Sequence, residues 1–95
     1  MLSGKQKRYL RSLMNEEKAV AQIGKEGISL NLIKTLDNYL KVHEIMKIQV
    51  LKTCPFEIKE IALDVAAQTK SDIVQIIGRV IIIYRPSKEK LIKLP

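Results

Sequence analysis

Hydrophobic positions follow the helical period of about 3.6 residues in three parts of the chain. Residues 4–14 predict a first helix, with an apolar face on one side and cations on the other. The apolar stripe from Leu32 to Leu40 predicts a second helix, which Ser29 or Asn31 can cap. We expect Cys54-Pro55 to open the third helix, because proline is tolerated at a first helical position.

Four other segments have the strand pattern, with alternating or continuous apolar residues. They are Ala19 to Ile23, His43 to Leu51, Asp72 to Ile77, and Val80 to Tyr84. The tight joint at Gly78-Arg79 predicts that the last two strands form an antiparallel hairpin. The element order is α-β-α-β-α-β-β. It predicts a single α/β domain over residues 1–95, in which three helices pack a four-stranded mixed sheet. We expect residues 86–95 to be a basic extension that is ordered only in part.

Charge changes this picture because it is segregated along the chain. Lys and Arg number 17 against 10 Asp and Glu, which gives a net charge of +7. Residues 1–41 carry an excess of +4, residues 42–77 an excess of −1, and residues 78–95 an excess of +4. If the fold brings the two ends of the chain onto one side, they form a basic face that attracts polyanions. The alternative is a solvated surface that only confers solubility.

No pattern in the sequence predicts catalysis, and we expect no enzyme, no metal site and no cofactor. His43 is the single histidine, and no His/Cys cluster has metal-ligand spacing. The single cysteine excludes an internal disulfide and fits a reducing, cytoplasmic location. No apolar run reaches the roughly 18 residues that a membrane helix needs, and the basic N-terminus lacks the apolar core of a signal peptide. We therefore expect no membrane partner.

The segment Gly24-Lys25-Glu26-Gly27 is the strongest candidate for phosphate binding. It lies between a predicted strand and a predicted helix, where unpaired N–H groups and the helix dipole favour an anion. Lys25 adds a cation, whereas the carboxylate of Glu26 repels phosphate unless it points away. The spacing excludes a nucleotide-triphosphate loop and a dinucleotide fingerprint. A plain turn that needs positive φ remains the alternative.

Further cations extend the candidate RNA-binding set beyond this loop. Arg79 in the hairpin turn and Arg85 after the last strand can each contact phosphate, and Arg79 can equally bond to backbone carbonyls. Aromatic residues are few, so recognition should depend on backbone charge and shape more than on base stacking. The first helix contributes the remaining candidates, which are Lys5, Lys7, Arg8 and Arg11.

Four motifs in the same order resemble the CRM domain family, in its stand-alone bacterial YhbY-type form. They are Leu2-Ser3-Gly4-Lys5-Gln6-Lys7-Arg8-Tyr9-Leu10-Arg11, Gln22-Ile23-Gly24-Lys25-Glu26-Gly27, Val74-Gln75-Ile76-Ile77-Gly78-Arg79 and Tyr84-Arg85-Pro86-Ser87. The resemblance implies an RNA-binding module associated with precursors of the large ribosomal subunit. It also implies a fold similar to the C-terminal domain of translation initiation factor 3, and it marks the glycine loop as an RNA contact.

The sequence thus predicts a cytoplasmic, monomeric, non-catalytic RNA-binding protein that acts in ribosome assembly on ribosomal RNA. One rival is a KH-type single-strand binder, whose GxxG loop resembles residues 24–27 but joins two helices. Another rival is a protein-interaction module whose basic face binds an acidic partner.

Overall fold

A computed structural model describes residues 2–95, and its elements follow the order expected from the sequence. The helices are α1 (Gly4–Met14), α2 (Leu30–His43) and α3 (Ile58–Thr69). The strands are β1 (Ala21–Ile23), β2 (Ile45–Val50), β3 (Asp72–Ile77) and β4 (Val80–Tyr84). The prediction of three helices around a four-stranded mixed sheet is therefore confirmed.

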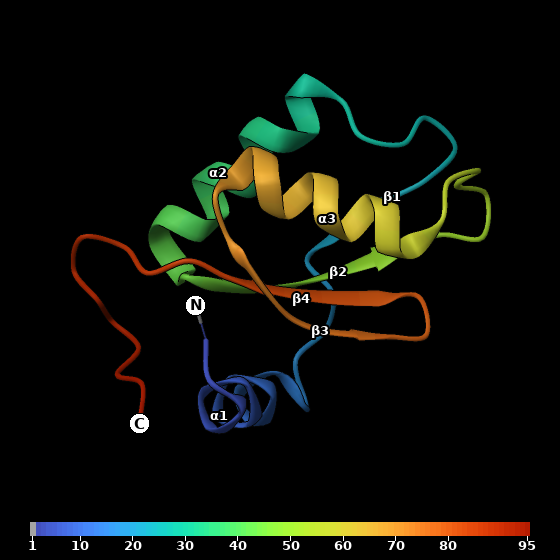
Figure 1. Cartoon of the computed structure of the whole chain (residues 1–95). Helices are drawn as coiled ribbons and strands as arrows, with labels where there is room; N and C mark the ends of the chain where they lie inside the picture. The colour runs from blue at the N-terminus through green and yellow to red at the C-terminus, as the bar shows by residue number, and fades with distance from the viewer. Residues whose placement is uncertain (1) are drawn as a thin grey trace.

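The strands lie in the order β1-β2-β4-β3. β1 runs parallel to β2, and β4 pairs antiparallel with both of its neighbours. Ile77 pairs with Val80, so the turn at Gly78-Arg79 closes a two-residue hairpin as predicted. Figure 1 shows α2 and α3 on one face of this sheet and α1 on the opposite face.

Both faces of the sheet are buried, and each has its own apolar core. The larger core lies under α2 and α3 and includes Ile48, Ile81 and Ile83. The smaller core lies under α1 and includes Leu10 and Ile82. The central strand β4 supplies both cores because its successive side chains point to opposite faces. This double burial explains its continuous run of β-branched residues.

Side-chain caps are present at two of the three helix N-termini, and the one at α2 was expected from the sequence. Ser3 and Gln6 form a capping box at the start of α1, in which each side chain bonds the other residue's backbone N–H. Ser29 caps α2 by accepting a hydrogen bond from the Leu32 N–H at 3.1 Å.

The apolar face of α1 is only partly covered. Leu10 on this face is fully buried, whereas Leu13 is 37% exposed.

The expected start of the third helix is wrong. Cys54 closes a turn that starts at Leu51, Pro55 follows this turn, and α3 begins only at Ile58 with Glu57 as its N-cap residue. The Cys54 N–H donates to the Leu51 carbonyl at 3.0 Å, and the Cys54 side chain is buried in the larger core. These contacts fix the residue in a tight turn before the helix can begin.

The boundary between the second helix and the second strand also differs from the expectation. His43 is the last residue of α2, where its ring stacks on Tyr39 with centroids 4.2 Å apart. Glu44 then adopts a left-handed φ of 68°, and its N–H donates to the Leu40 carbonyl at 2.9 Å. This left-handed cap ends the helix, and β2 starts only at Ile45.

Candidate nucleic-acid interface

The glycine segment forms a tight turn between β1 and α2. The Gly27 N–H donates to the Gly24 carbonyl at 3.0 Å, and the turn exposes Lys25 and Glu26 at its tip. Gly27 has a φ of 68° and is buried, and a Cβ built on it would lie 2.8 Å from the Phe56 ring. A strand precedes this loop, whereas the GxxG loop of a KH domain follows a helix, so the fold does not support the KH alternative.

The backbone of Leu51 holds this loop against two others. Its N–H donates to the carbonyl of Ile23, directly before the glycine turn, at 2.8 Å. Its carbonyl accepts from the Arg79 Nη2 of the β3–β4 hairpin at 2.7 Å. The glycine loop, the segment after β2 and the hairpin turn therefore meet at one end of the sheet.

Arg79 has a clear structural role at this end. Its Nε donates to the Val50 carbonyl at 2.8 Å, while its own backbone carbonyl accepts from the Val50 N–H at 2.7 Å. The side chain is still exposed, so the guanidinium braces the loops and faces solvent at the same time. Lys52, which the sequence did not single out, is exposed directly after Leu51 and brings a further cation to this end. The pairing of these loops, which brings Lys52 and Arg79 to the same end of the sheet, could not be inferred from the sequence pattern.

A groove of about 430 Å³ runs between α1 and the edge strand β3. Arg8 and Arg11 line it from the helix, and Gln75 and Ile77 line it from the strand. No acidic residue lines this groove, and α1 has none in its first turn. Because Ile77 directly precedes the hairpin turn, the groove leads towards Arg79. The strand side of the groove therefore ends two residues before Arg79.

The remaining candidates on α1 are less enclosed. Lys5 is exposed and Lys7 is half-buried, and neither lines the groove. Within residues 2–95, the ion pairs involve only Lys41 and Arg85, both with Asp37. The four cations of α1 therefore remain without an acidic partner in the part of the chain that the structure describes.

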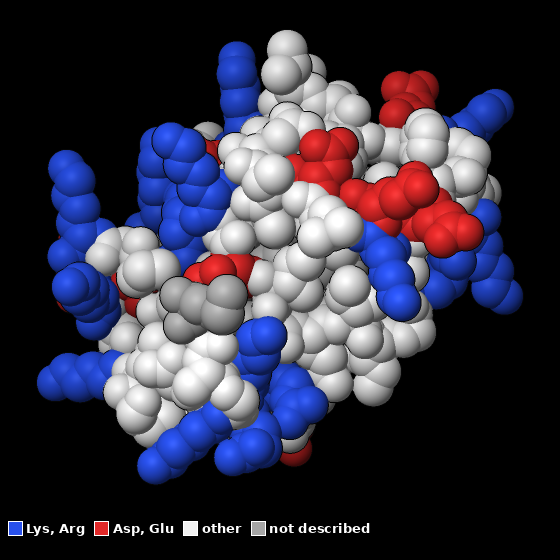
Figure 2. Space-filling model, viewed as in Figure 1, with Lys and Arg blue, Asp and Glu red and all other residues white. Residues whose placement is uncertain are grey.

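Acidic side chains gather on the other side of the glycine loop. A cleft of about 220 Å³ is lined by Glu26 together with Glu60 and Asp64 of α3. Figure 2 shows a large group of acidic side chains at the upper right, over α3, and many basic side chains below and to the left, around α1 and the C-terminal segment. Glu26 thus belongs to the acidic α3 side, and an anion approaching the loop meets less repulsion from the Leu51 and Arg79 side.

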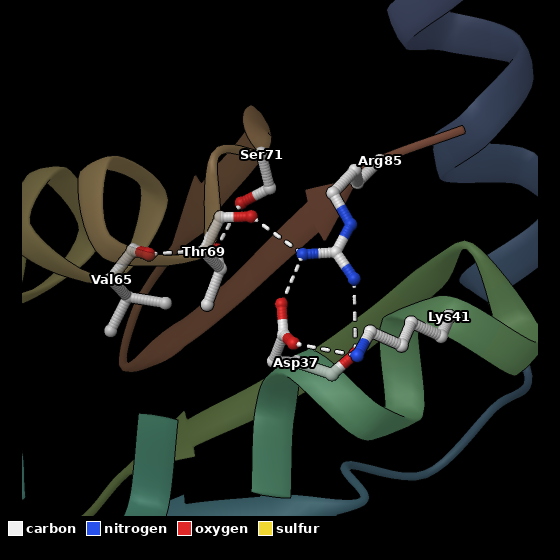
Figure 3. A network of polar contacts seen from close by, with 6 residues as sticks. All are labelled: Asp37, Lys41, Val65, Thr69, Ser71 and Arg85. Atoms are coloured by element: carbon white, nitrogen blue, oxygen red, sulfur yellow. Dashed lines mark hydrogen bonds and ion pairs between the residues drawn. The ribbon is translucent and has the colours of Figure 1, made fainter. Parts of the chain in front are cut away.

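Arg85 is engaged inside the protein (Figure 3). Its Nη1 donates to the carboxylate of Asp37 and, at 2.7 Å, to the carbonyl of Thr69, the last residue of α3. Its Nη2 donates to the Asp37 carbonyl at 3.0 Å. The hydrogen bond from Arg85 lowers the pKa of Asp37, against the opposing effect of burial. The guanidinium ties α2, α3 and the end of β4 together, which leaves it poorly placed for phosphate.

Glu44 anchors the C-terminal segment, which we call the strap (residues 85–95). Its fully buried carboxylate accepts hydrogen bonds from the Ser87 N–H and hydroxyl and from the N–H groups of Leu91 and Ile92. Burial alone would raise the pKa of Glu44, but these hydrogen bonds outweigh it and lower the pKa to about 2. The strap is therefore more firmly held than its sequence predicts.

Two negative findings bound the chemistry of the described residues. Between residues 2 and 95, no group of three or more His, Cys, Asp or Glu side chains has an arrangement that could hold a metal ion. None of the helices in the same range combines the length and apolar character needed to cross a bilayer.

Comparison with known proteins agrees with the fold. The chain is 40% identical over 96 residues to the probable RNA-binding protein YqeI of Bacillus subtilis, and the match covers both chains completely. It is 34% identical to an RNA-binding protein of Haemophilus influenzae, covering 99% of this chain and 95% of the relative. The solution structure of the protein SAV1595 from Staphylococcus aureus superposes with a TM-score of 0.83 at 48% identity, and the match covers both chains completely. The family model of the CRS1/YhbY (CRM) domain matches residues 2–85. The chain therefore belongs to the CRS1/YhbY (CRM) domain family.

Proposed function

We propose that this protein binds ribosomal RNA in precursors of the large ribosomal subunit and assists ribosome assembly in the cytoplasm. RNA binding is supported by the family and by relatives that are named as RNA-binding proteins. The ribosomal target comes from the family resemblance of the four sequence motifs. In this proposal the protein acts as a monomer and without catalysis, by docking on structured RNA.

The observation that carries this proposal is the groove between α1 and β3. Arg8 and Arg11 line it without any acidic neighbour. Arginine binds phosphate through a planar fork of N–H donors, so two arginines along one groove suit consecutive phosphates of an RNA strand. Lys5 and Lys7 on the same helix add charge near its N-terminal end.

The glycine loop provides the second part of the proposed contact. The Gly24–Gly27 turn projects Lys25 into solvent, and the neighbouring loops bring Lys52 and Arg79 to the same end of the sheet. An RNA backbone that follows the groove past Ile77 would reach these three cations next. We place Arg85 in the scaffold of this surface and not on the RNA.

The test is a binding titration with a transcript of large-subunit ribosomal RNA at several salt concentrations. We expect Arg8→Gln with Arg11→Gln to weaken binding and to lower the slope of log K against log salt by about two, one unit for each lost phosphate contact. The matched control is Lys34→Gln with Lys70→Gln. These substitutions remove one exposed charge from α2 and one from the C-cap of α3, on the opposite face of the sheet from α1. The two double variants therefore carry the same net charge.

Equal losses of RNA affinity in the two variants would contradict the proposed role of the groove, because general electrostatic attraction would then explain binding. The choice of target is tested separately. Crosslinking in cells followed by RNA sequencing should recover large-subunit ribosomal RNA and its precursors above small-subunit RNA. Recovery of proteins without RNA would favour the interaction-module alternative.

A further inference from the structure

The strap is bound to the body of the protein by one carboxylate. Glu44 receives hydrogen bonds from three backbone N–H groups and one hydroxyl of the strap. These partners are 43 to 48 residues away from Glu44 in the chain. The Glu44 carbonyl also accepts from the Arg85 N–H at 2.7 Å, so the strap is fixed from its first residue.

The strained backbone of Glu44 indicates that its side chain has a role besides ending α2. The residue has a φ of 68°, a region that favours glycine and costs other residues about 1 kcal/mol. Glycine would end α2 without this cost, but it would leave four donors of the strap without their acceptor. The position therefore requires the carboxylate rather than a simple helix stop.

The anchored strap lies on the same face of the sheet as α1. Ile92 and Leu94 pack against the smaller core beside Leu2 and Leu10. At the end of the strap, the Pro95 carbonyl accepts a hydrogen bond from Gln6 Nε2 at 3.3 Å. Figure 1 shows the strap descending past the sheet towards α1.

The strap presents three lysines to solvent, of which Lys90 and Lys93 lie near α1 and Lys88 lies in a hollow with Lys41 of α2. Lys88, Lys90 and Lys93 are all exposed. Lys90 and Lys93 line a hollow of about 560 Å³ between the strap and the N-terminal part of α1, to which Gln6 contributes. Asp72 is the one acidic residue that lines this hollow. α1 is thus flanked by the arginine groove on its β3 side and by the lysine-bearing strap near its N-terminus.

We propose that the strap is a built part of the RNA-binding surface, and that Glu44 is the positioning residue that holds Lys90 and Lys93 beside α1. This inference rests on the proposed RNA binding and adds a second group of RNA contacts, made by the strap. Binding of RNA then depends on a buried anion that never touches the RNA. A freely moving tail would supply the same charge but would lose conformational entropy on binding.

Glu44→Gln tests this proposal because the two explanations predict opposite signs. The substitution preserves shape, but the amide can direct only one oxygen at the donors, and its NH2 group opposes their N–H groups. It also raises the net charge by one. If the lysines act only as diffuse charge, RNA should bind as tightly as before or more tightly. If the strap is positioned, binding should weaken and the salt slope should fall by about two, the contribution of Lys90 and Lys93.

The matched control is Glu89→Gln, which changes charge by the same amount on the strap itself. Glu89 is exposed, and its side chain makes no hydrogen bond among those of residues 2–95, so this variant should keep the strap in place. Hydrogen exchange at the amides of Ser87, Leu91 and Ile92 reports directly whether the strap has been released. We expect release in Glu44→Gln and not in Glu89→Gln.

A second variant covers the case in which Glu44→Gln does not fold. Ile92→Ser weakens the packing of the strap without changing any charge and should also reduce RNA affinity. Adding Lys88→Gln, Lys90→Gln and Lys93→Gln to either released variant should then weaken binding much less than in the wild type. Unchanged affinity with a released strap would overturn this inference while wild-type binding stands. Absence of RNA binding in the wild-type protein would instead overturn the proposed function and this inference together.

Discussion

The ring of Phe56 occupies the space in which any residue other than glycine at position 27 would place its Cβ. The closest ring carbon lies 2.8 Å from that position. The glycine loop therefore packs against a residue of the segment before α3, and the φ of 68° at Gly27 independently favours glycine. The backbone conformation and this contact both favour glycine at position 27 before any question of phosphate arises.

Substituting Gly27 should be more costly than substituting another glycine with the same backbone conformation. Gly27→Ala combines a left-handed φ with the clash against Phe56, and we expect the free energy of unfolding to fall by about 2–3 kcal/mol. The control is Gly78→Ala, whose φ is 55° but whose Cβ would meet nothing within 4 Å, so only the backbone cost of about 1 kcal/mol applies. Urea unfolding measures both. Equal losses would show that Phe56 gives way freely.

Substitutions of Arg79 and Lys52 should affect different properties, protein stability for Arg79 and RNA binding for Lys52. Arg79→Lys keeps the charge but loses the paired bonds to the Val50 and Leu51 carbonyls, so stability should fall by about 1 kcal/mol or more. Lys52→Gln should leave stability unchanged and lower the salt slope of RNA binding by about one. Thermal unfolding and salt-dependent titration of both variants test this contrast. A Lys52 variant with an unaltered slope would remove that residue from the proposed surface.

Arg85 should matter for stability and not for RNA. Arg85→Gln leaves the Asp37 carboxylate and the Thr69 carbonyl without their shared donor, and we expect a loss of about 2–3 kcal/mol. The pKa of Asp37, which the Arg85 hydrogen bond lowers, should return towards its ordinary value when measured by NMR titration. The salt slope of RNA binding should remain that of the wild type under conditions where the variant is folded. A lower slope would return Arg85 to the RNA-contacting set.

Lowering the pH should remove the contribution of Glu44 to the free energy of unfolding. The pKa of Glu44 is about 2 in the folded protein against an ordinary value of 4.5, so the unfolded chain binds the proton more readily between these values. The contribution is fully present above pH 4.5 and is lost as pH falls towards 2, with a total of about 3 kcal/mol. Stability measured across this range should therefore fall more steeply in the wild type than in Glu44→Gln. Parallel curves would mean that the carboxylate is not held as the structure shows.

Local patterns in the sequence were sufficient for the elements and for their order. Periodicity located three helices and four strands, Ser29 was identified as a possible cap, and the Gly78-Arg79 turn was identified as a hairpin. These features depend on residues within a few positions of one another, so the sequence contains their causes. The four motifs also led to the family, which the comparisons confirm.

The long-range polar contacts could not be inferred in this way. In the sequence Glu44 is an ordinary carboxylate after His43. Only the tertiary structure brings it against the N–H of Ile92, which lies 48 residues further along the chain. Arg79 reaches Val50 across 29 residues, and Arg85 reaches Asp37 across 48. A long polar side chain finds its partner only after the apolar cores have fixed the backbone around it. The hydrophobic pattern therefore specifies the fold locally, while the roles of Glu44, Arg79 and Arg85 arise from the chain segments that this fold brings together.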